Sequence, residues 1–70
     1  MKNFTGEVFY RVTVPEAPGQ PPFCAGVWAT ESRGRIFEAA PILRWSLNMT
    51  VERLEAWVAR KGGTMERVER

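Results

Sequence analysis

Apolar and polar side chains alternate along the first part of the chain. Between Gly6 and Val14 every second residue is large and apolar. Side chains of a β-strand point alternately to its two faces, so this two-residue period predicts a strand with one face in a core and the other partly exposed. The core face would carry Val8, Tyr10, Val12 and Val14, and the other face Phe9, Arg11 and Thr13.

Two more extended segments follow. Phe23–Thr30 alternates in the same way, and Arg35–Ala39 returns after a hairpin loop, Glu31–Gly34. The segment Pro15–Pro22 holds four prolines and one glycine, and proline has no N–H to donate to a sheet. We therefore expect Pro15–Pro22 to be a stiff loop that connects two neighbouring strands.

The second half of the chain has helical signals. Pro41 is suited to open a short helical turn, Pro41–Ser46. Thr50 is a good N-cap for a longer helix, Val51–Lys61, whose apolar stripe is Val51, Leu54 and Val58 with Trp57 beside it. Two glycines end this helix, and Thr64–Glu69 then reads as an edge strand that returns to the sheet.

These elements predict a small α+β fold. We expect a mainly antiparallel sheet of three to four strands with one main helix packed on one face, in the order β-β-β-short helix-helix-β. The 70 residues are too few for a second independent core, so residues 1–70 form a single domain. A chain this short is marginally stable unless it packs densely or oligomerises.

The sheet face opposite the helix is the more informative one for function. If the helix covers the side with Val8, Val12, Val27 and Ala29, the reverse side carries aromatic rings beside guanidinium groups. A hairpin loop with an even number of residues would also bring Trp28, Thr30, Arg35 and Phe37 to the same face. The candidate binding residues are therefore Phe9, Arg11, Trp28, Arg35 and Phe37.

Three interpretations of this face remain open. Trp, Phe and Arg are enriched at hot spots of protein interfaces, so the face can bind a partner protein. Unpaired bases can also stack on such rings while arginine contacts phosphate. Alternatively, the chain covers the face itself, with Pro41–Leu47 and the first residues folding over it through Phe4, Ile42, Leu43 and Trp45.

Composition argues against catalysis and against metal or cofactor binding. The chain has no histidine and no aspartate, and Cys24 is its only cysteine. No histidine can activate Cys24, which we expect to be a buried, inert thiol. No phosphate-binding loop or carboxylate cluster is present either. We expect no enzyme activity, no cofactor, no metal and no small-molecule substrate.

Charge limits the choice of partner. Ten basic and eight acidic residues are spread along the chain and leave a net charge of +2, without the clustered basic patch of most nucleic-acid binders. The longer helix is also a poor DNA-recognition helix, because Glu52 and Glu55 in its first turns would repel phosphate. The N-terminus has no apolar signal-like stretch, and one unpaired cysteine fits a reducing compartment, so a cytoplasmic location is expected.

The sequence thus predicts a non-enzymatic protein-interaction or regulatory module. Its partner would be a protein, with self-association as a homodimer the first expectation, through either the aromatic and arginine face or the exposed edge strand. The alternative is a single-stranded nucleic-acid-binding protein that uses the same face. No membrane partner is expected. Few amide side chains and a proline-rich loop are compatible with a thermophilic source.

Overall fold

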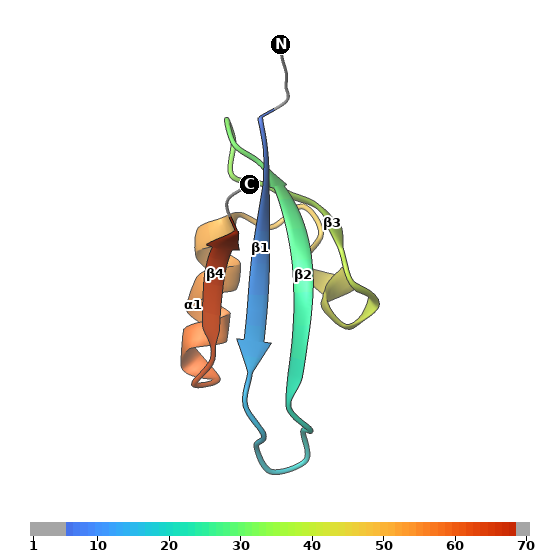
Figure 1. The fold of residues 1–70 in the computed structure, drawn as a ribbon, viewed down its shortest axis with the longest axis vertical. Coiled ribbons are helices and arrows are strands. Elements are labelled where there is room, and N and C mark those ends of the chain that lie inside the picture. Colours follow the sequence, from blue (N-terminus) through green and yellow to red (C-terminus); the bar gives the residue numbers. More distant parts are fainter. Residues whose placement is uncertain (1–5, 69–70) are drawn as a thin grey trace.

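The computed structural model describes residues 6–68, which form a four-stranded antiparallel sheet and two helical segments. The strands are β1 (Glu7–Val14), β2 (Phe23–Thr30), β3 (Ile36–Ala39) and β4 (Thr64–Val68). The helical segments are the 3-10 helix η1 (Pro41–Ser46) and the α-helix α1 (Val51–Arg60). The order across the sheet is β3-β2-β1-β4, so β1 and β2 are central (Figure 1). The predicted α+β class and the order of elements are confirmed.

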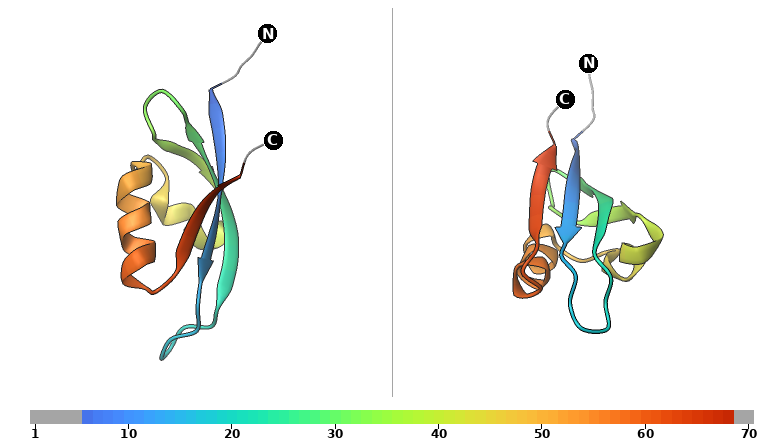
Figure 2. Two further views of the ribbon diagram at one scale, coloured as in Figure 1. Left: turned by 60° about the vertical axis from the view of Figure 1, so that its left-hand side comes forward. Right: turned by 60° about the horizontal axis from the view of Figure 1, so that its bottom comes forward.

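The molecule has two layers, with both helical segments on the same side of the sheet (Figure 2). The helix α1 contacts β1 and β4, and η1 contacts β2 and β3. The interpretation that Pro41–Leu47 folds over the reverse face is therefore wrong, because η1 packs on the helix side. Phe4, the other residue assigned to that cover, lies outside the described residues.

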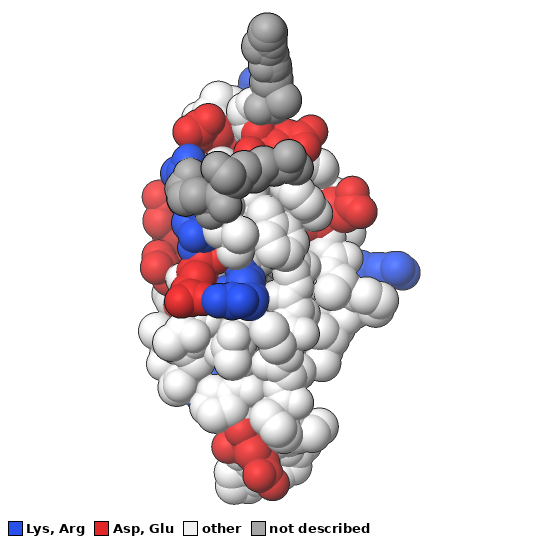
Figure 3. Space-filling model, in the orientation of Figure 1, with Lys and Arg blue, Asp and Glu red and all other residues white. Residues whose placement is uncertain are grey.

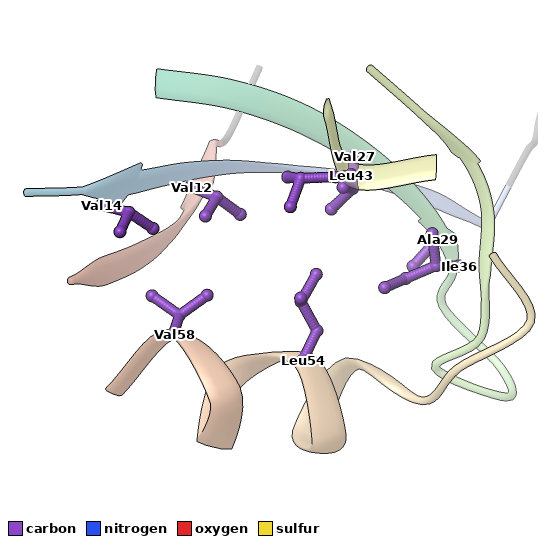
Figure 4. Close-up of a cluster of buried hydrophobic side chains, with 8 residues drawn as sticks. All are labelled: Val12, Val14, Val27, Ala29, Ile36, Leu43, Leu54 and Val58. Carbon is purple, nitrogen blue, oxygen red and sulfur yellow. The ribbon is translucent and has the colours of Figure 1, made fainter. Parts of the chain in front are cut away.

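The core lies between the sheet and the helical layer. Leu54 and Val58 point from α1 toward the sheet, and Leu43 reaches the same space from η1 (Figure 4). These three side chains are at most 1% exposed. They pack against the inner face of the strands, formed by Val12, Val14, Val27, Ala29 and Ile36. The predicted helix stripe and the predicted core face of β1 and β2 are confirmed.

Capping residues and glycines fix the ends of α1. The Thr50 hydroxyl accepts a hydrogen bond from the backbone N–H of Arg53 at 3.2 Å, which satisfies one of the free donors of the first turn. Gly62 adopts a left-handed conformation with φ 76° after the last turn. A Cβ at Gly63 would collide with the Thr13 carbonyl oxygen of β1, so only glycine lets the chain turn this close to the sheet.

The hairpin between β2 and β3 contains a β-bulge. Ala29 pairs with Ile36, as a regular hairpin requires, but Trp28 then pairs with Glu38. One extra residue, Phe37, is accommodated in β3 between these pairs. Glu38 rather than Phe37 therefore lies opposite Trp28, because loop length sets the register only until a bulge interrupts it.

The two edges of the sheet differ. The segment Asn48–Val51 runs beside β3, where the Ile36 N–H donates to the Met49 carbonyl at 2.9 Å and Val51 N–H donates to the Gly34 carbonyl at 2.7 Å. Within the described residues, β4 is left as the sheet edge without a further strand beside it. This confirms β4 as the predicted edge strand.

Candidate functional site on the outer sheet face

The outer face is the side of the sheet turned away from α1 and η1, and it is the front of the molecule in Figures 1 and 3. Strand register arranges its side chains in rows across the sheet. The first row takes one residue from each strand: Glu38, Trp28, Phe9 and Val68. The second row is Gly26, Arg11 and Glu66, and the third is Cys24, Thr13 and Thr64.

Two aromatic rings form the centre of this face. The ring centroids of Phe9 and Trp28 are 4.8 Å apart, and the planes are tilted by 53°. Such a tilted pair is a favourable aromatic contact across neighbouring strands. Both residues are only half-buried, and no helix or strand of residues 6–68 covers them. The pair is therefore a half-buried apolar surface on the open side of the sheet.

Gly26 leaves the space that the Phe9 ring occupies. A Cβ at Gly26 would collide with the outer atoms of the Phe9 ring, which lies across the glycine. A glycine inside a strand weakens it, and a ring that covers the glycine from the neighbouring strand restores part of the lost packing. Gly26 thus lets Phe9 lie flat on the sheet and meet Trp28.

Arg11 is held by an ion pair with Glu66 on β4. Its Nε and Nη2 donate to the Glu66 Oε1 at 3.2 Å and 2.5 Å. The hydrogen bond and the negative charge of Glu66 raise the pKa of Arg11 above its ordinary value, so the guanidinium stays charged. Both side chains are more than half exposed, so solvent screens the pair.

The charges on the outer face are mostly negative. Alternation along β1 places Glu7 on this side, and register adds Glu38 and Glu66 against the single guanidinium of Arg11. Figure 3 shows a band of uncharged side chains running down the face, with charges of both signs around it. Among residues 6–68 the face is therefore an uncharged strip around the Phe9–Trp28 pair, with three glutamates and one paired arginine on the same side, although the whole chain carries a net charge of +2.

The structure brings together three of the five predicted binding residues. Phe9, Arg11 and Trp28 lie in adjacent rows of the outer face. Arg35 does not join them, because its Nη1 donates to the Asn48 carbonyl at 2.6 Å and ties β3 to the segment before α1. Phe37 is 45% exposed and occupies the bulge.

Sequence reasoning missed the two carboxylates and the valine that complete the face. Glu66 and Val68 reach it from β4, which was predicted as a strand but without a pairing partner that would assign its faces. Glu38 reaches it only because of the bulge. The length of β4 and its charged residues could have predicted the position of Glu66. The local sequence pattern does not predict the bulge.

The prediction that Cys24 is buried is wrong. The thiol is exposed rather than buried, and lies on the outer face, where the Thr13 hydroxyl donates to its Sγ at 3.7 Å. The alternation of β2 had already assigned Cys24 to this face, and the face is open in the structure.

A second exposed apolar group surrounds η1. Ile42 is 51% exposed, Trp45 48% and Leu47 38%. The ring of Trp45 meets the Trp57 ring of α1 edge-on at 4.8 Å between centroids. The sequence assigned Ile42 and Trp45 to a cover over the outer face, and the structure places η1 on the opposite side of the sheet.

The described residues show neither a metal site nor a membrane span. Residues 6–68 contain no group of three or more His, Cys, Asp or Glu side chains arranged to hold a metal ion. None of the helices in the same part of the chain is long and apolar enough to cross a membrane. Comparison with protein-family models, curated proteins and solved structures finds no significant match to this chain.

Proposed function

We propose that this protein is a non-catalytic interaction module that binds a partner protein through the outer face. The observation that carries the proposal is the half-exposed Phe9–Trp28 pair on a sheet side that no described element covers. Large aromatic side chains at the centre of a contact, with charged groups at its rim, contribute most of the binding energy of typical protein interfaces. The arrangement of Arg11, Glu66 and Glu38 around the rings fits that pattern.

The absence of histidine and aspartate from the sequence supports a non-catalytic role. The exposed Cys24 has a threonine hydroxyl beside it, and that group cannot act as the general base that a nucleophilic thiol needs. The remaining acids of the outer face flank aromatic rings on an open surface, without the enclosure that positions a substrate.

The outer face is a better candidate than the β4 edge. Pairing the full length of β4 with a second copy, antiparallel and in register about its central residue, would place Glu66 opposite Glu66. Like charges directly opposite each other destabilise a strand pair. Charged residues on a short edge strand are also a common device against edge-to-edge pairing.

The homodimer predicted from the sequence is the first form of this proposal to test. Light scattering on the purified chain at increasing concentration measures its mass, and Trp28→Ala is the test variant. Trp45→Ala is the matched control, because it removes the same side chain from the η1 side of the molecule. Self-association through the outer face would be lost in Trp28→Ala and retained in Trp45→Ala.

The same variants decide whether the outer face is the contact for self-association. Because Trp28 is only half-buried, Trp28→Ala should cost well below the roughly 3–5 kcal/mol typical of a buried tryptophan, and the variant should stay folded. A wild-type chain that is monomeric at high micromolar concentration would remove the homodimer and leave a foreign protein as partner. Self-association that is unchanged in Trp28→Ala would rule out the outer face as its contact.

Single-stranded nucleic acid is the alternative ligand, since bases can stack on Phe9 and Trp28. The charges oppose it, because three glutamates surround the rings and Arg11 is already paired. We expect no quenching of tryptophan fluorescence by a short oligothymidine at low salt. Quenching that fades as salt is added and disappears in Trp28→Ala would favour the alternative.

A further inference from the structure

We infer that the partner presents a cationic side chain, arginine above all, to Trp28 and Glu38. This inference rests on the proposed function and specifies the chemistry of the partner. Its starting point is the first row of the outer face, where register pairs Glu38 with Trp28 on the neighbouring strand. The opposite neighbour of Trp28 in that row is the Phe9 ring.

A carboxylate beside an exposed indole is a complementary surface for a cation. Side chains directly opposite each other on antiparallel strands have their Cβ atoms about 4.5–5.5 Å apart, within reach of one guanidinium. Tryptophan has the strongest cation–π attraction of the aromatic side chains, and a guanidinium can stack on its face. One arginine can therefore lie on the Trp28 ring and direct its N–H groups to Glu38.

No basic side chain of residues 6–68 occupies this site. Glu38 has no hydrogen-bond or ion-pair partner among residues 6–68. Both arginines that the sequence assigned to this face have other partners: Arg11 pairs with Glu66, and Arg35 donates to the Asn48 carbonyl. Within residues 6–68 no cation pairs with Glu38, so its carboxylate is open to a cation of another molecule.

The charge balance favours a basic segment of a different protein over a second outer face. Two copies meeting face to face would bring Glu7, Glu38 and Glu66 against the same three residues, and among residues 6–68 the paired Arg11 alone would compensate them. The acidic character is local, since the whole chain carries +2. The net charge of the protein would therefore not attract a basic peptide. Binding of such a peptide would indicate a specific contact with Trp28 and Glu38.

The test is a peptide titration of the full ¹⁵N-labelled chain followed by NMR. The probes are a peptide with three arginines spaced by glycine and serine, and the same peptide with glutamine in place of arginine. The chain has three tryptophans, so three indole N–H signals can be followed, and Trp28→Phe identifies the one from Trp28. We expect the arginine peptide to shift the Trp28 signal and to leave those of Trp45 and Trp57 in place.

Two charge variants make the test specific. Glu38→Gln should weaken the binding of the arginine peptide by about 2- to 5-fold, the size expected for one exposed charge contact on an aromatic ring. Glu55→Gln removes an exposed carboxylate from α1 on the other side of the molecule and should leave the affinity unchanged. Thermal melts of both variants should match the wild type.

The outcomes separate this inference from the proposed function. Equal shifts of the Trp28 signal by the glutamine peptide, or unchanged affinity in Glu38→Gln, would overturn the cationic partner and leave the outer face as a protein contact. No shift of Trp28 with either peptide would overturn the inference as well. If, in addition, a chain that self-associates stayed associated in Trp28→Ala, the homodimer form of the proposed function would fail with it.

Discussion

The two faces of this sheet are built by the same strands from different kinds of side chain. On the inner face Val12, Val14 and Val27 are at most 1% exposed and pack under α1 and η1. On the outer face, one residue away along each strand, the aromatic pair is half-buried and the charged side chains are exposed. The inner residues are all aliphatic, whereas the outer residues include aromatic and charged side chains.

This contrast indicates a division of roles between the faces. Burying one aliphatic side chain contributes about 1.5–3 kcal/mol, so the inner face supplies most of the stability of such a short chain. The half-buried Phe9–Trp28 pair contributes less to that stability, and in the proposed function it is the surface that binds the partner. Changes on the inner face should therefore alter folding, and changes on the outer face should alter binding.

The largest effect is expected from Leu54→Ala. Leu54 is 0% exposed and projects from α1 into the centre of the core (Figure 4). Removing its side chain loses buried area and leaves a cavity, at about 2–5 kcal/mol. Urea unfolding followed by circular dichroism should show a chain that is largely unfolded, since domains of this size have little stability to spare. A midpoint equal to that of the wild type would contradict the assignment of Leu54 to the core.

Gly63→Ala should have the next largest effect. Its Cβ would collide with the Thr13 carbonyl oxygen, a backbone atom that cannot move aside without disturbing β1. Overpacking of this kind costs typically about 1–3 kcal/mol. The same unfolding measurement checks it. A Gly63→Ala midpoint equal to that of the wild type would refute the close approach.

Gly26→Ala is expected to change binding more than stability. Its Cβ meets only the far end of the Phe9 side chain, which can rotate away, so we expect a stability loss under about 1 kcal/mol. The displaced ring can no longer keep its tilted contact with Trp28. Partner binding should therefore fall, and we expect the same fall for Phe9→Ala. A variant that binds as well as the wild type would show that the ring geometry is dispensable.

The part of the structure that the sequence predicts well follows from local pattern. Alternation assigns the faces of β1 and β2, and the stripe of Leu54 and Val58 assigns the buried side of α1. Register around a bulge and the packing side of a short 3-10 helix depend on contacts between distant segments. For this reason the placements of Glu38 and Trp45 and the hydrogen bond from Arg35 to the Asn48 carbonyl were not predictable.

The smallest effect is expected from the ion pair of Arg11 and Glu66. Both side chains are more than half exposed, and exposed pairs contribute about 0–1 kcal/mol. A double-mutant cycle with Arg11→Ala and Glu66→Ala should therefore give a coupling energy below about 1 kcal/mol that decreases with added salt.

The affinity of the same two variants for the arginine peptide tests how the charges near Trp28 affect binding. Glu66→Ala frees the Arg11 guanidinium, which then lies within the first rows of the outer face without its counter-charge. The freed positive charge should weaken the affinity for the arginine peptide, and Arg11→Ala should raise it. Equal affinities in both variants would show that the charges of the second row do not reach the aromatic pair, and that Glu38 alone sets the preference of the face for a cation.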